Sequence, residues 1–223
     1  MTQPFHVRWL AECAGTALLV GIGTAAIVAT TGVGNGRFVI LAAAWFVAVS
    51  LPVFVFASIS GSEINPVVTL AMVLDGRRPT REAIPYGLAQ LSGAFLGSAG
   101  VGLLFGNFDH LGATVPSNGD IVRTFLAEFA FTFALIGTVL VLVRLGAGRW
   151  RWRLLWPGAV VAVSTYVIGP WTGSSLNPAR TLGPAVLSAT YTDLWVYLLA
   201  TPLAAIAAVV IGRAVERRRP HHT

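Results

Sequence analysis

The chain contains six long apolar segments, and these constrain its fold more than any other feature. They cover residues 9–30, 38–59, 83–106, 121–144, 153–171 and 192–213. Each is close to the roughly 20 residues that a helix needs to cross a bilayer. Two shorter segments, at 66–75 and 178–187, cannot cross alone, because ten helical residues extend only about 15 Å. The pattern predicts an all-α integral membrane protein with six transmembrane helices and two half-helices.

Composition excludes the soluble classes, and the charges suggest an orientation. Hydrophobic residues make up 55% of the chain, charged residues 11%, and mean hydropathy is +0.74, unlike a soluble globular protein. All 15 basic residues are Arg, and clusters of them mark cytoplasmic segments. We therefore expect both termini to be cytoplasmic and the clusters to contact anionic lipid headgroups, not nucleic acid. The clustered residues are Arg8; Arg77, Arg78 and Arg81; Arg144, Arg149, Arg151 and Arg153; and Arg213, Arg217, Arg218 and Arg219.

A ten-residue motif occurs twice, once before each short segment. Residues 61–70 read Gly-Ser-Glu-Ile-Asn-Pro-Val-Val-Thr-Leu, and residues 173–182 read Gly-Ser-Ser-Leu-Asn-Pro-Ala-Arg-Thr-Leu. Asn is a strong N-cap, and Pro is favoured in the first turn of a helix. Each motif therefore predicts the start of a half-helix, and in a membrane two such starts can face each other at the midplane.

The duplication extends beyond the motif. Ala11-Glu12-x-Ala14-x-Thr16 recurs 116 residues later, and the Asn-Pro motif recurs after 112 residues. Each half contains three spans, an odd number, so the two halves must have opposite orientations in the membrane. We predict a single channel domain over residues 1–223, made of inverted repeats at about 9–106 and 121–213.

Both motifs, with Arg180 directly after the second, make the chain resemble the major intrinsic protein family of aquaporins and aquaglyceroporins. The resemblance covers essentially the whole chain, and the absence of Lys favours a bacterial member. It implies a homotetramer in the plasma membrane, with one pore per subunit and no cofactor. It also places the motifs at the pore midpoint. Their central residues are Asn65, Pro66 and Val67, and Asn177, Pro178 and Ala179.

The resemblance gives the two Asn residues a role in conduction. Their amide hydrogens would be offered to molecules at the midpoint, beside helix N-termini that each carry about half a positive charge. Such a midpoint admits neutral molecules that carry an acceptor oxygen, and it repels cations and interrupts a chain of proton-conducting waters. Val67 replaces the usual Ala of the motif, and we expect a packing adjustment there with a modest effect on pore width.

The resemblance also implies an outer constriction around Arg180, since a charge inside a membrane is a functional hypothesis by default. Counting back from the motifs, the other constriction positions are Trp45, Thr165 and Ser174. Trp supplies an apolar wall, and Thr replaces a His of water-selective members, which favours a wider opening. An alternative register places Phe46 in the pore instead of Trp45. Thr181 and Ala185, after the second motif, match water-type members, so the solute signal is mixed.

Three carboxylates lie in or beside the predicted spans. Glu12 and Glu128 occupy equivalent repeat positions, where we expect them to accept hydrogen bonds from the re-entrant loops. A proton relay is the alternative for this pair. Glu63 is a candidate for the inner vestibule: it either points into the cytoplasmic mouth and disfavours anions, or bonds a nearby amide outside the pore.

The sequence thus predicts a passive channel for water and small uncharged solutes that excludes protons and ions. Glycerol-like molecules, hydrogen peroxide and neutral metalloid hydroxides are the solute classes considered. One alternative is a strictly water-selective channel, and another is a proton-coupled transporter that uses Glu12 and Glu128. The four His residues are dispersed or terminal and suggest no metal site, and no nucleophile has a base within reach, so we expect no enzyme.

Overall fold

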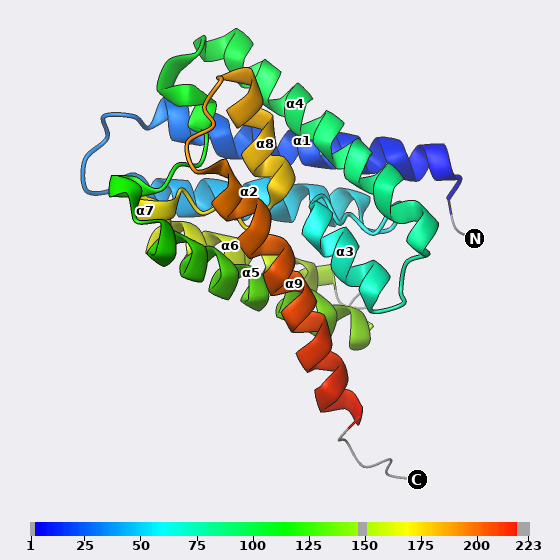
Figure 1. Ribbon diagram of the computed structural model, residues 1–223. Coiled ribbons are helices and arrows are strands. Elements are labelled where there is room, and N and C mark those ends of the chain that lie inside the picture. Colours follow the sequence, from blue (N-terminus) through cyan, green and yellow to red (C-terminus); the bar gives the residue numbers. More distant parts are fainter. Residues whose placement is uncertain (1–2, 147–150, 218–223) are drawn as a thin grey trace.

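The computed structural model describes residues 3–146 and 151–217, which form a bundle of helices (Figure 1). Among these residues, five helices have the length and apolar composition of a membrane span. They are α1 (Phe5–Ala29), α2 (Arg37–Phe56), α4 (Ala83–Phe105), α5 (Ile121–Arg144) and α9 (Leu194–Arg217). Their bounds agree closely with five of the six predicted apolar segments. Arg149, Arg218 and Arg219 lie outside the described residues, as do the side chains of Arg151 and Arg153.

The predicted span at 153–171 is shorter and broken. Helix α6 (Trp156–Val167) has 12 residues and follows a 3-10 turn at Arg151–Leu155. After Val167 the chain restarts as the short helix α7 (Gly169–Thr172), which has Pro170 in its first turn. Pro170 has no amide hydrogen to continue the ladder of α6, which explains the break. Turn, helix and short helix together occupy the predicted segment.

The two half-helices begin at the predicted caps. Helix α3 (Pro66–Leu74) follows Asn65, whose side chain accepts a hydrogen bond from the Val67 amide. Helix α8 (Pro178–Leu187) follows Asn177, whose side chain accepts from the Ala179 and Arg180 amides. The loops before the caps share a strained backbone. Positive φ angles occur at four non-glycine residues in matched pairs, Ser62 and Ser174 (48° and 47°) and Ile64 and Leu176 (45° and 55°).

Helix contacts follow the internal repeat. Helix α1 packs along α4, and the corresponding pair in the second half is α5 and α9. Half-helix α3 contacts α9 of the other half, and α8 contacts α4 in the same way. Helices α2 and α6, which correspond to each other, pack together. Each half-helix is therefore held by a span from the opposite half, so the halves form one unit.

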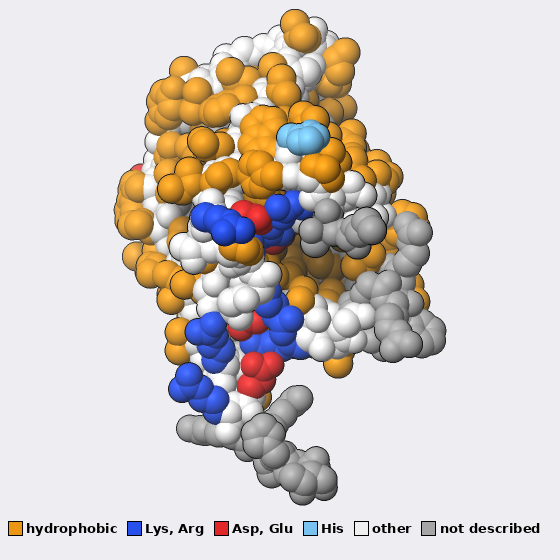
Figure 2. Space-filling model, turned by 90° about the vertical axis from the view of Figure 1, so that its right-hand side faces the viewer, with side chains coloured by type: hydrophobic (Ala, Val, Ile, Leu, Met, Phe, Trp, Pro, Cys, Tyr) orange, Lys and Arg blue, Asp and Glu red, His pale blue; other side chains and the backbone are white. Residues whose placement is uncertain are grey.

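Charged side chains gather at one end of the bundle, called here the basic face (Figure 2). Arg8 near the start of α1 bonds Glu82 through both terminal nitrogens at 2.8 Å. Asp75 at the end of α3 accepts from Arg77 and Arg144, and Arg213 of α9 lies 3.6 Å away. The start of α1 and the end of α9 thus meet the same connection, 75–82. The hydrogen bonds from Arg77 and Arg144 outweigh partial burial and lower the pKa of Asp75.

Candidate functional site

Each motif Asn side chain bonds the backbone of the loop in the opposite half. Asn65 Nδ2 donates to the Leu176 carbonyl at 2.9 Å, and Asn177 Nδ2 donates to the Ile64 carbonyl at 3.0 Å. The capped ends of α3 and α8 therefore meet. An amide nitrogen carries two hydrogens, so each Asn retains one donor beyond this bond. Both residues line the internal cavity, and these remaining donors are available to its contents.

Buried carboxylates hold the loops that precede the half-helices. Glu12 accepts from the backbone amides of Glu63 and Ile64, and Glu128 accepts in the same way from Ser175 and Leu176, at 2.7–3.0 Å. Glu12 also accepts from the Ser60 hydroxyl and the Gln90 amide. Both carboxylates are fully buried. Each carboxylate thus bonds the backbone of a re-entrant loop, and neither is among the residues of the cavity wall.

A cavity of about 290 Å³ runs past the meeting point of the half-helices. Its wall includes Trp45 and Arg180 towards one end and Arg77 and Arg78 on the basic face. Between them, aliphatic side chains line most of the wall, from α1, α2, α3, α5 and α6. These are Leu19, Val49, Val53, Val68, Met72, Leu135, Val139, Leu142, Val143, Leu154, Pro157 and Val161. The cavity thus combines an apolar wall with a few polar groups, as is usual for small-molecule sites.

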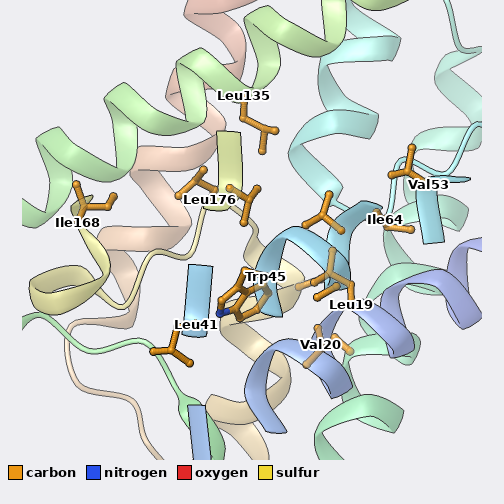
Figure 3. Close-up of a cluster of buried hydrophobic side chains, with 14 residues drawn as sticks. Leu19, Val20, Leu41, Trp45, Val53, Ile64, Leu135, Ile168 and Leu176 are labelled. Atoms are coloured by element: carbon orange, nitrogen blue, oxygen red, sulfur yellow. The ribbon is translucent and has the colours of Figure 1, made fainter. Parts of the chain in front are cut away.

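Arg180 and Trp45 form the end of the cavity opposite the basic face. The Arg180 guanidinium carbon lies 4.9 Å from the centroid of the Trp45 ring. Its Nη1 donates to the Gly112 carbonyl at 2.8 Å, whereas Nε and Nη2 are buried without a hydrogen-bond partner among the described residues. Two donors of a buried cation are therefore free beside the cavity, where a hydrogen-bonding solute would satisfy them. Figure 3 shows Trp45 packed among Leu19, Val20 and Leu41.

The other two predicted constriction residues are buried but are not among the residues that line the cavity. Ser174 Oγ lies 2.6 Å from Ser164 Oγ of α6. Thr165 donates its hydroxyl hydrogen to the Val161 carbonyl of its own helix. Phe46, the alternative to Trp45, is also absent from the cavity wall. The structure therefore brings Trp45 and Arg180 together on the cavity, whereas Thr165 and Ser174 are buried and do not line it.

Glu63 adopts neither of the two predicted arrangements in full. It lines the cavity, and its Oε1 accepts from Arg78 Nε at 2.7 Å. Arg78 also donates to Glu82 and to the Ser60 carbonyl, and it lies 3.8 Å above the Tyr86 ring. Burial lowers the pKa of Arg78, but the charge and hydrogen bond of Glu63 outweigh burial and raise it. Glu63 is thus part of an ion pair, which the sequence analysis did not foresee.

Val67 and Ala179 differ in their surroundings. Val67 packs in a cluster with residues of α5 and α9, including Ile136, Leu140 and Ala205. Ala179 is fully buried in the cluster around Trp45. Neither residue lines the cavity, so the extra methyl groups of Val67 are accommodated in the helix interface.

Sequence reasoning missed three groups at the site. The Gly112 carbonyl comes from the polar loop at 107–120, and a backbone acceptor carries no sequence signal. Arg78 was assigned to a basic cluster and not to the cavity wall. Gly23 touches Trp45 from α1, and a single glycine in an apolar span is unremarkable in sequence. Among the described residues, no group of three or more His, Cys, Asp or Glu side chains could hold a metal ion.

Membrane-spanning helices around two half-helices, whose capped ends meet on an internal cavity, define a membrane channel. A sequence model of the major intrinsic protein family matches residues 1–211, and the chain belongs to this family. Members of this family are channels and not enzymes.

Individual relatives agree with this assignment. The chain is 35% identical over 218 residues to nodulin-26 of Glycine max, covering 97% of this chain and 80% of that protein. It is 33% identical to glycerol uptake facilitator protein-like 6 of Lactiplantibacillus plantarum, covering 93% and 97%. The solved structure of the aquaglyceroporin from Plasmodium falciparum superposes with a TM-score of 0.80 at 25% identity, covering 96% and 100%. The match to a solved aquaglyceroporin supports the predicted fold.

Proposed function

We propose that the protein is a passive channel for water and small uncharged solutes, including molecules of glycerol size, and that it excludes protons and ions. One observation carries the proposal: a single cavity reaches from the Trp45–Arg180 pair past both motif Asn residues to Arg77 and Arg78. Hydrogen peroxide and neutral metalloid hydroxides share the size and neutrality of such solutes.

The polar groups of the cavity fit a neutral solute better than an ion. The donors that have no partner among the described residues are the second amide hydrogens of Asn65 and Asn177 and the Nε and Nη2 groups of Arg180. These groups favour solutes with acceptor oxygens. Two helix N-termini and a buried guanidinium add positive charge along the same path, which repels cations. A water held by both Asn donors must direct its oxygen towards them, and this interrupts a proton wire.

The apolar wall favours solutes with a carbon backbone in addition to water. Trp45 and the aliphatic residues offer nonpolar contact over most of the wall, and the Asn65, Asn177 and Arg180 donors lie among them. A glycerol-like molecule has both a carbon edge and a hydroxyl edge. Names of similar proteins, a glycerol uptake facilitator-like protein and an aquaglyceroporin, support this solute class for the present chain.

A transporter driven by protons is disfavoured by the environment of Glu12. Its two carboxylate oxygens already accept four hydrogen bonds, and the residue is fully buried away from the cavity wall. A relay would need a carboxylate that exchanges protons with the transport path. We infer that Glu12 and Glu128 are structural.

The test is stopped-flow light scattering on proteoliposomes under water, glycerol and urea gradients, with empty liposomes as control. We expect water and glycerol permeabilities above the control, following only the solute gradient. Water flux without glycerol flux would leave the strict water channel as the correct alternative. Uptake that depends on an imposed pH gradient, and is lost in Glu12→Gln, would establish the transporter instead.

We further propose a homotetramer in the plasma membrane with the basic face in the cytoplasm. The charge distribution supports the orientation. Arg side chains of α1, α5 and α9 converge at that end, and segments rich in positive charge are retained on the cytoplasmic side. Protease access to tags at the two termini in inside-out and right-side-out vesicles tests the orientation. Native mass spectrometry tests the tetramer.

A further inference from the structure

Gly23 of α1 lies directly against the Trp45 indole. A Cβ atom placed on Gly23 would be 2.4 Å from Trp45 Cη2 and 2.6 Å from Cζ2 and Cζ3. These three atoms form the outer edge of the six-membered ring. Carbon atoms in van der Waals contact are about 3.5–4.0 Å apart, so the present position of the indole is compatible only with glycine at residue 23.

The same indole meets Arg180 with its face, at 4.9 Å from the guanidinium carbon. Trp45 is therefore fixed between the backbone of α1 at its edge and the cation at its face. It is 3% exposed, and what it exposes contributes to the cavity wall. A shift of the ring away from Gly23 would consequently alter the opening beside Arg180.

Helix α1 cannot easily retreat to relieve such a contact, because it is tightly packed against α4. A Cβ on Gly93 would be 2.1 Å from the Cys13 carbonyl oxygen, and one on Gly97 would be 2.6 Å from the Ala17 carbonyl oxygen. The two helix backbones are thus in direct contact on that side of α1. Arg180 is also held, by the Gly112 carbonyl. The indole is the element that can move, and the open space near it is the cavity.

The second half of the chain lacks this arrangement at the matching positions. Gly23 lies eleven residues after Glu12, and the residue eleven after Glu128 is Val139. Trp45 lies twenty residues before Asn65, and the residue twenty before Asn177 is Pro157. Val139 and Pro157 both line the cavity. The first half thus has a glycine where it has the large Trp45 ring, and the second half, which has no ring at the matching position, has Val139 in place of the glycine.

We propose that Gly23 is a specificity-determining positioning residue that sets the width of the Trp45–Arg180 constriction by giving the indole room to lie back against α1. The inference rests on the proposed function, since width matters only if solutes pass this point. Any side chain at residue 23 pushes the ring into the opening and discriminates against the larger solutes first.

The test is Gly23→Ala in proteoliposomes, with glycerol and water permeability measured on the same preparation. We expect glycerol permeability to fall about tenfold, the lower end of the discrimination that one methyl group can confer, while water permeability falls about twofold. The matched control is Gly21→Ala on the same helix, where a Cβ would make an ordinary 3.7 Å contact with Gly97. It should leave both permeabilities at wild-type values.

Rescue separates a width effect from general damage to the fold. Trp45→Phe removes the ring edge that meets Gly23, so the double variant Gly23→Ala/Trp45→Phe should recover glycerol permeability relative to Gly23→Ala. A folded Gly23→Ala protein with the wild-type glycerol-to-water ratio would overturn the proposal. So would a double variant that is no better than Gly23→Ala.

Two further comparisons keep the proposal open to refutation. If Gly23→Ala does not fold, Trp45→Phe is compared with the double variant. Because Phe lacks the ring edge that meets residue 23, the proposal requires the two to pass glycerol at equal rates, and a slower double variant contradicts it. If the wild-type protein passes water but no glycerol, the broad-solute function fails by itself. Gly23→Ala must then lower water permeability relative to Gly21→Ala, and unchanged water flux contradicts the role of Gly23.

Discussion

The two halves of this channel share the same order of helices and the same capped half-helix, but they differ in chemistry. At the Arg180 end, an aromatic ring and a buried cation close the cavity. The matching positions 112 residues away are occupied by Pro157 in place of Trp45 and by Val68 in place of Arg180, and both also line the cavity. The inverted repeat therefore places cavity-lining residues at matching positions, whereas the aromatic ring and the buried cation, where we propose that solutes are discriminated, lie at one end only.

The basic face and the Arg180 end differ in whether their Arg side chains are paired with carboxylates. Its arginines are paired with acidic groups: Arg78 with Glu63 and Glu82, and Arg144 with Asp75 and Glu216. Arg180 keeps two nitrogens without a partner among the described residues. Paired charges hold the ends of helices together, while the unpaired donors are available to solutes. The end with more Arg residues is therefore not the end at which we expect solutes to be selected.

The largest expected difference between the halves concerns the supporting carboxylates. Glu12 accepts four hydrogen bonds and Glu128 accepts two from its loop. Each buried donor left unsatisfied costs about 1–3 kcal/mol, so Glu12→Ala should lower thermal stability more than Glu128→Ala. Unfolding in detergent, followed by circular dichroism, measures both. Equal midpoint shifts would show that the additional bonds of Glu12 contribute nothing.

Replacing the selective charge should affect ion exclusion at one end only. Arg180→Ala removes a buried cation from the path, and we expect proton leak to rise about tenfold, equivalent to about 1.4 kcal/mol of barrier. Val68→Ala, at the matching position, should leave the leak unchanged. Pyranine-loaded liposomes with an imposed pH gradient provide the measurement. A similar leak in both variants would show that Arg180 adds nothing to the proton barrier at the Asn pair.

The motif substitution should affect stability and not flux. Val67 packs against α5 and α9 and is not part of the cavity wall. Val67→Ala should therefore cost about 1 kcal/mol through lost packing while water permeability stays at the wild-type value. An increase in permeability would show that the side chain narrows the midpoint. Ala179→Gly in the second half serves as the comparison.

The smallest effect is expected for the ion cluster of the basic face. The pKa of Asp75 is lowered in the folded state, below the usual value of about 3.9. Its stabilising contribution is therefore complete above that usual value and is lost as pH falls through the lower folded pKa. Asp75→Asn should reduce stability by about 0.5–1 kcal/mol at pH 7. Thermal unfolding at pH 7 and in acid tests this: the difference from wild type should shrink as pH falls.

Sequence reasoning located most of the fold because its signals are local. Asn65 and Asn177 fixed the starts of both half-helices, since a cap followed by Pro acts within a few residues. The break after Val167 was missed, although Pro170 provides a local reason for it. Both features depend on short-range backbone chemistry, which can be predicted from neighbouring residues without knowing which distant segments pack against them.

Site residues were predictable only where the residue type itself, in its sequence context, indicates a function. Arg180 is conspicuous in a membrane motif, and Trp45 was implied by the family resemblance, counted back from the first motif. The bond to the Gly112 carbonyl and the contact of Gly23 with the indole depend on how distant segments pack. The ion pair of Glu63 with Arg78 was not predicted for the same reason, because Arg78 lies fifteen residues further along the chain, beyond half-helix α3.

The reciprocal bonds between the Asn side chains and the opposite loops have a consequence for biosynthesis. Asn65 needs the Leu176 carbonyl, and the Ile64 carbonyl needs Asn177, more than a hundred residues further along the chain. A ribosome that has released only the first three spans has made a re-entrant loop with no partner. These bonds across the midpoint can therefore form only after the second loop has been made and has entered from the other side of the membrane.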